Sequence, residues 1–159
     1  MAGYKDLPIL PGKEGGNRKG PNFAALLFRI AARVLTCLDG FNPNQPTVII
    51  YFNPECDHCQ YEATEIGRQP ERFAKANMIL ITPYDSTKRI EAFADKYKLW
   101  QVDNLVVLLD RNFQFKKYFG TSVFPSVFIY GANKRLLKQF IGEVKMEAVL
   151  KIIDGNEKL

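Results

Sequence analysis

The chain has 159 residues, of which 47% are hydrophobic and 25% charged, as expected of one soluble domain with a sizeable core. Its 22 Lys and Arg exceed its 17 Asp and Glu, but the excess is scattered along the chain. Nucleic-acid binding, which needs a basic cluster on one face, is therefore not expected. Three cysteines are too few for a scaffold held together by disulfides.

The N-terminal residues carry weak structural signals. Residues 1–20 contain five Gly, two Pro and no apolar run, which predicts a flexible lead-in without a signal peptide, followed by a single domain over residues 21–159. In Phe23–Leu38 apolar residues recur at helical spacing, although several of them would also suit a strand. Arg29 and Arg33 interrupt this segment, which is also too short to span a bilayer.

The remaining residues alternate between strand and helix patterns. Buried strands are predicted at Val48–Phe52, Asn77–Pro83 and Leu105–Leu109, and a hairpin at Val127–Tyr130 and Arg135–Ile141. Helices are predicted from about Cys56 to Arg68, after Asp85 or Ser86, and over Glu143–Ile153. Pro70 is expected to kink the first of these helices or to begin a second, short one. Strand–helix alternation followed by a hairpin predicts an α/β fold with a mixed central sheet and helices on both faces.

Two cysteines three positions apart, Cys56 and Cys59, follow the apolar run Val48–Phe52 and open the first predicted helix. A Cys-x-x-Cys pair at the junction of a strand and a helix is the arrangement of a redox-active dithiol. Cys56 would face the positive end of the helix dipole and unpaired backbone amides, and both favour the thiolate. We therefore expect Cys56 to be the more exposed, attacking thiol, and Cys59 to resolve the mixed disulfide.

Three charged or polar neighbours bear on this chemistry. Glu62 lies beside Cys59 on the predicted helix and would either take the proton from Cys59 or be a solvated helix residue, and spacing alone leaves both interpretations open. A protonated His58 would stabilise the Cys56 thiolate, whereas Asp57 would oppose it. The sequence therefore leaves the direction of electron flow open.

Other uses of the cysteines are less favoured. Tetrahedral zinc needs four ligands, and beyond the pair the chain offers Cys37 together with His58, which lies inside the pair. No metal is therefore expected, and Cys37 is interpreted as a buried structural thiol. The Pro-x-x-x-Thr-x-x-Cys signature of peroxiredoxins is absent, because Pro54 is followed directly by Glu55 and Cys56.

Pro125 precedes the predicted strand Val127–Tyr130, where a residue that cannot donate a ladder hydrogen bond is tolerated. Residues 46–153 resemble the thioredoxin superfamily. The resemblance rests on this proline, on the run Val48–Phe52 leading into Cys56-Asp57-His58-Cys59, and on the closing hairpin and helix. They look most like the extracytoplasmic TlpA/ResA-type thiol-disulfide oxidoreductases. The fold implied is a thioredoxin-like three-layer α/β fold.

The resemblance implies a role for each matching residue. Cys56 matches the nucleophilic cysteine and Cys59 the resolving one, and Glu62 matches the acidic residue that transfers protons in the ResA group. Pro125 matches the cis-proline that packs against the dithiol, and the backbone of Phe124 would pair with a bound substrate.

The chain also departs from the family pattern. Phe52-Asn53-Pro54-Glu55 replaces the usual tryptophan-rich approach to the dithiol, and Ile50 replaces the buried aspartate of cytoplasmic thioredoxins. Phe124 is bulkier than the residue usually found before the proline. These departures concern substrate range and redox poise and leave the dithiol chemistry unchanged.

We therefore expect an enzyme that exchanges disulfides with protein substrates and acts as a reductant through a redox-active Cys56–Cys59 disulfide. We expect no organic cofactor, and an upstream redox partner protein would return the disulfide to the dithiol. The resemblance implies a bacterial periplasmic or membrane-associated setting for a monomer that has lost its signal or membrane tether. The alternative is a non-catalytic thioredoxin-fold binding module whose cysteines form a structural disulfide or stay inert.

Overall fold

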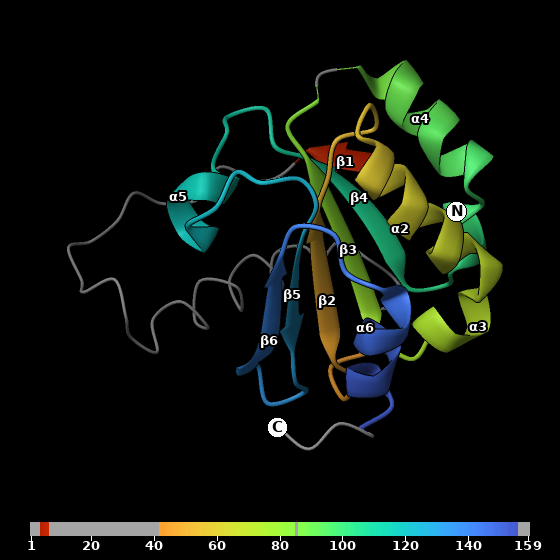
Figure 1. The fold of residues 1–159 in the computed structure, drawn as a ribbon, viewed down its shortest axis with the longest axis vertical. Coiled ribbons are helices and arrows are strands. Elements are labelled where there is room, and N and C mark those ends of the chain that lie inside the picture. The colour runs from red at the N-terminus through yellow and green to blue at the C-terminus, as the bar shows by residue number, and fades with distance from the viewer. Residues whose placement is uncertain (1–3, 7–41, 85, 156–159) are drawn as a thin grey trace.

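A mixed six-stranded sheet, in the order β1-β4-β3-β2-β5-β6, forms the centre of the computed structural model, which describes residues 4–6, 42–84 and 86–155 (Figure 1). The strands are β1 (Tyr4–Asp6), β2 (Thr47–Tyr51), β3 (Asn77–Thr82), β4 (Leu105–Leu109), β5 (Ser126–Tyr130) and β6 (Leu136–Ile141). Strands β1 to β4 pair in parallel, whereas β5 is antiparallel to both β2 and β6. The predicted mixed sheet and terminal hairpin are confirmed.

The helices follow the strands in the predicted alternation. They are α2 (Asp57–Arg68), α3 (Pro70–Phe73), α4 (Thr87–Lys96), α5 (Phe115–Phe119) and α6 (Met146–Ile153), with a short 3-10 helix η1 (Leu99–Gln101). Pro70 begins α3, and the Ser86 hydroxyl caps α4 by accepting from the Arg89 N–H. The closing helix begins at Met146, three residues later than the Glu143 predicted.

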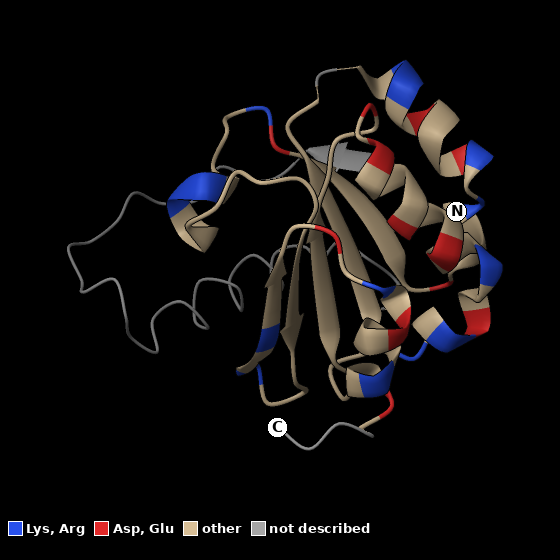
Figure 2. Ribbon diagram, viewed as in Figure 1, with Lys and Arg blue, Asp and Glu red and all other residues tan. Residues whose placement is uncertain are grey.

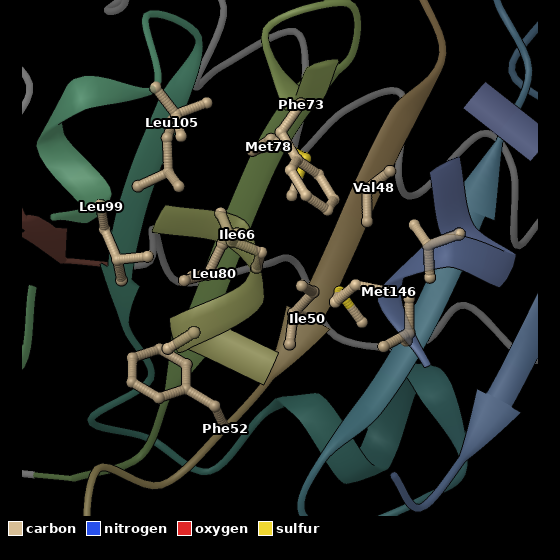
Figure 3. Packing of buried hydrophobic residues seen from close by; sticks show 14 of the residues in the cluster. Val48, Ile50, Phe52, Ile66, Phe73, Met78, Leu80, Leu99, Leu105 and Met146 are labelled. Atoms are coloured by element: carbon tan, nitrogen blue, oxygen red, sulfur yellow. The ribbon is translucent and has the colours of Figure 1, made fainter. Parts of the chain in front are cut away.

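Alternate side chains of the central strands enter two separate cores, because successive side chains in a strand point to opposite faces. Val48 and Ile50 contact the larger core, which contains residues of α2, α3, α4 and α6 (Figure 3). Ile49 and Tyr51 contact the smaller core, which contains residues of α5. The strands are buried on both faces, which explains why their sequences are continuous apolar runs.

Of the N-terminal residues, the structure describes residues 4–6. Tyr4–Asp6, assigned above to the flexible lead-in, forms β1 and pairs in parallel with Val107–Leu109. This is a correction: three residues are too few for a recognisable strand pattern, and the free edge of β4 supplies the backbone partners. The helix expected at Phe23–Leu38 and the thiol of Cys37 lie outside the described residues. Within the described ranges, no helix has the length and apolarity required to cross a membrane.

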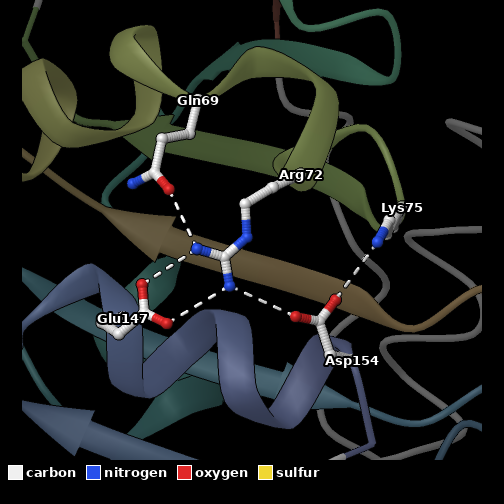
Figure 4. Close-up of polar contacts among 5 residues, drawn as sticks. All are labelled: Gln69, Arg72, Lys75, Glu147 and Asp154. Carbon is white, nitrogen blue, oxygen red and sulfur yellow. Dashed lines mark hydrogen bonds and ion pairs between the residues drawn. The ribbon is translucent and has the colours of Figure 1, made fainter.

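Charged residues are spread over the surface. Lys and Arg occur on α3, α4, α5, β6 and α6 in the view of Figure 2. The densest network joins α3 to α6, where Arg72 donates to both carboxylate oxygens of Glu147 at 3.0 and 3.2 Å and to Asp154 at 3.3 Å (Figure 4). Lys75 lies 3.6 Å from the same Asp154 carboxylate.

Candidate active site

A tight turn carries the chain from the end of β2 to the start of α2. The Asn53 side chain accepts from the Glu55 N–H at 2.9 Å, and the Asn53 carbonyl accepts from the Cys56 N–H at 3.0 Å. Cys56 has an extended backbone and is the N-cap residue of α2, its carbonyl accepting from the Gln60 N–H at 3.0 Å. This turn places the first cysteine at the positive end of the helix dipole, as expected.

The two cysteines differ in exposure as predicted. Both are free thiols; Cys56 is half-buried, whereas the Cys59 side chain points into the core and only 3% of the residue is exposed. Burial raises the pKa of the Cys59 thiol well above its ordinary value; a backbone hydrogen bond with Asn53 lowers it in part, and a hydrogen bond with Cys56 raises it further. Cys59 therefore needs a base before it can attack.

The segment before β5 lies directly against Cys56. The register of the β2–β5 pair sets Ser126 opposite Tyr51, so that Phe124 and Pro125 lie beside the end of β2. The Phe124–Pro125 peptide bond is cis, and the Cys56 thiol donates to the Phe124 carbonyl at a sulfur–oxygen distance of 3.9 Å. The Phe124 ring packs on Tyr51, with centroids 4.8 Å apart. The structure thus brings Phe124 and Pro125 to the dithiol.

Glu62 is buried rather than solvated, with 1% of its surface exposed. Its Oε1 accepts from the Val144 N–H at 3.0 Å, and its Oε2 has no hydrogen-bond partner among the described residues. Burial raises the pKa of Glu62 to about 7; the Val144 N–H opposes this shift, the Glu143 charge adds to it and His58 reduces it. Glu62 can therefore exchange a proton near neutral pH, and the interpretation as a solvated residue is wrong.

Glu62 and Cys59 line the same small cavity, about 10 Å³ in volume, and the other residues that line it are apolar. Ile50 of β2 is one of these. The position where cytoplasmic thioredoxins carry their aspartate is therefore apolar, and the acidic group reaches the resolving cysteine from the helix instead. This arrangement can serve acid–base chemistry at the Cys59 sulfur.

The dipeptide between the cysteines is exposed, and its histidine has a partner that the sequence did not indicate. His58 Nδ1 lies 2.6 Å from Oε2 of Glu143, which precedes α6. Asp57 lies in the first turn of α2, where a negative charge suits the helix dipole. Sequence reasoning missed Glu143 and Val144, because they are more than 80 residues from their partners and belong to no motif. No cluster able to hold a metal ion occurs in the part of the chain that the structure describes.

The sequence profile of the AhpC/TSA family matches residues 21–139, which is most of the chain. The chain belongs to the AhpC/TSA family. This is a thioredoxin-fold family, so the superfamily resemblance read from the sequence is confirmed. No curated protein is significantly similar to this member in sequence.

Solved structures similar to this family member are thiol-disulfide oxidoreductases and their homologues. DsbF of MTB, in mixed oxidized and reduced forms, is 18% identical with a TM-score of 0.60, covering 72% of this chain and 82% of that one. A secreted Mycobacterium tuberculosis disulfide oxidoreductase homologous to Escherichia coli DsbE is 16% identical with a TM-score of 0.59, covering 70% and 82%. StoA from Bacillus subtilis is 16% identical with a TM-score of 0.56, covering 69% and 83%. At these identities the likeness concerns the fold, which is thioredoxin-like.

Proposed function

We propose that this protein is a thiol-disulfide oxidoreductase that reduces disulfides of protein substrates. The observation that carries the proposal is the pairing of an accessible thiol with a buried one that shares a cavity with a carboxyl group. Cys56 lies at a helix N-terminus against the Phe124 carbonyl, and Cys59 lies beside Glu62, whose pKa is raised to about 7.

The reaction has two exchange steps. The Cys56 thiolate attacks one sulfur of the substrate disulfide, forming a mixed disulfide and releasing the other substrate sulfur as a thiolate. Glu62 then accepts the proton of Cys59, and the Cys59 thiolate attacks the Cys56 sulfur. The second substrate sulfur leaves and is protonated. The substrate has gained two electrons, and the protein is left with a Cys56–Cys59 disulfide.

A substrate strand would approach along the segment before β5. The backbone of Phe124 lies beside Cys56 and would pair with the substrate, with Pro125 shaping the surface next to the sulfur. No organic cofactor is needed, because the cysteine pair carries the electrons and an upstream partner protein returns it to the dithiol. The kinds of protein with this fold, one of them described as secreted, support an extracytoplasmic bacterial setting. A monomer suffices for this chemistry.

Insulin reduction in the presence of dithiothreitol tests the proposal. We expect the native chain to accelerate precipitation of the insulin B chain and the Cys56→Ser variant to show only the background rate. Equal rates for the two proteins would favour a binding module with an inert cysteine pair. Equilibration with glutathione buffers gives the direction: a reduction potential near −270 mV, roughly that of thioredoxin, supports a reductant, and one near about −120 mV indicates an oxidant.

A further inference from the structure

The loop between β6 and α6 contacts the dithiol site through consecutive residues, 142–144, which we call the site loop. Its first residue, Gly142, donates its N–H to the Pro125 carbonyl at 2.9 Å. Its last residue, Val144, donates its N–H to Glu62 at 3.0 Å. Gly142 has a φ of +95°, which glycine adopts without strain, and so lets the chain turn over the site as it leaves β6.

The middle residue of the site loop is the partner of the active-site histidine. Because hydrogen bonds hold the loop on both sides, the Glu143 carboxylate is kept over the first turn of α2. Its Oε2 lies 2.6 Å from His58 Nδ1, a short distance typical of a charge-assisted hydrogen bond. His58 and Glu143 are 67% and 41% exposed, so the pair adds little to stability. The main effect of this ion pair is therefore on the charge next to the two cysteines.

We propose that Glu143 is a positioning residue that sets the redox equilibrium of the dithiol by binding His58. The inference rests on the proposed function and concerns the same site. An imidazolium between the two cysteines favours the Cys56 thiolate and so makes the dithiol more oxidising. Glu143 holds the ring by Nδ1 and balances its charge, which keeps the protein a reductant.

Three acidic residues surround His58 in the described part of the chain. Helix α2 contributes Asp57, next to His58 in the chain, and the buried Glu62, while the site loop contributes Glu143. Glu143 raises the pKa of Glu62 and His58 lowers it, so the pair also acts on the group next to Cys59. The two partners therefore oppose each other at Glu62, and the pair acts on the dithiol through His58, beside Cys56.

A double-mutant cycle tests the proposal. The variants Glu143→Gln, His58→Ala and the double variant are equilibrated with glutathione buffers, and the reduced fraction is read by maleimide mass tagging. We expect Glu143→Gln to shift the equilibrium toward the dithiol by about threefold. His58→Ala should have little effect in the native background and should cancel the shift in the Glu143→Gln background.

Glu147→Gln is the matched control, since Glu147 is an exposed glutamate near the start of α6 that binds Arg72 instead of His58. It should leave the equilibrium unchanged. The proposal is overturned if His58→Ala shifts the equilibrium equally in both backgrounds, or if Glu147→Gln acts as strongly as Glu143→Gln. Because the equilibrium with glutathione needs no protein substrate, failure to reduce insulin would sink the proposed function alone and leave this cycle readable.

Discussion

Helix α6 and the loop before it are joined to the α2–α3 segment by charged groups at two places, and the two places use carboxylates differently. At the dithiol, Glu62 is buried, its Oε2 has no hydrogen-bond partner within the described ranges, and burial raises its pKa to about 7. At the other, Glu147 is exposed and binds both amino groups of Arg72 (Figure 4). Contact with Glu147 and Asp154 raises the pKa of Arg72 further, so its guanidinium stays charged at all ordinary pH values.

The difference shows that burial, more than residue type, separates a reactive carboxyl from a structural one. A carboxylate in water keeps its charge near neutral pH and can hold a cation, as Glu147 does. One enclosed by Ile50, Phe52 and other apolar side chains loses the stabilisation of its charge and becomes a proton acceptor.

The largest effect is expected for Cys59→Ser. Cys56 would still attack a substrate disulfide, but nothing would resolve the product, so a covalent complex with the substrate should accumulate and turnover should fall to background. Non-reducing gels and mass spectrometry measure the trapped complex. Arg72→Ala, at the other place, should turn over like the native chain. A Cys59→Ser variant that still turns over would contradict the two-cysteine mechanism.

The next effect is kinetic and concerns Glu62→Gln. The amide keeps the hydrogen bond from Val144 but cannot accept the proton of Cys59, so resolution of the mixed disulfide should slow by about a hundredfold at pH 7. Quenched-flow trapping with a peptide disulfide measures this step. Glu65→Gln, on the same helix but paired with Arg68, is the control and should resolve at the native rate. Equal rates for the two variants would remove Glu62 from the mechanism.

The same substitution should change how stability depends on pH. The pKa of Glu62 rises from an ordinary value of 4.5 to about 7 on folding, so the folded state binds the proton more tightly. The stability this proton confers is complete below about pH 4.5 and is lost as the pH rises through 7. Relative to Glu62→Gln, the native chain should lose up to about 3 kcal/mol between pH 4 and pH 8.

Urea unfolding of the two reduced proteins across this range measures the difference, because other titrating groups are common to both and cancel. A constant difference between native and Glu62→Gln proteins would mean that Glu62 is not the titrating group inferred from its burial.

The smallest effect is expected at the Arg72 network. Arg72→Ala removes ion pairs with Glu147 and Asp154 and should lower the midpoint of thermal unfolding slightly, with the loss shrinking at high salt. The dithiol equilibrium with glutathione should not change. If Arg72→Ala shifted the dithiol equilibrium as Glu143→Gln is expected to, the Arg72 network and the dithiol site would be one coupled region.

The order of strands and helices and the place of the cysteine pair could be predicted from the sequence, because these features depend on local patterns. Continuous apolar runs predict strands buried on both faces, and a Cys-x-x-Cys pair after such a run lies at a helix N-terminus. The prediction that Cys56 is more exposed than Cys59 followed from the place of Cys56 at the helix N-terminus and is confirmed, since Cys56 is half-buried and Cys59 is buried.

The surroundings of the two sulfurs, by contrast, depend on contacts that form only in the folded protein. Spacing left Glu62 open between core and solvent, and the packing of α2 against the sheet buried it. The His58–Glu143 and Glu62–Val144 contacts join residues 85 and 82 positions apart. They exist because the pairing of β5 with β6 brings the site loop to the first turns of α2, and no local sequence pattern encodes this long-range contact. Long-range strand pairing therefore supplied the electrostatic setting of a dithiol that the sequence had already located.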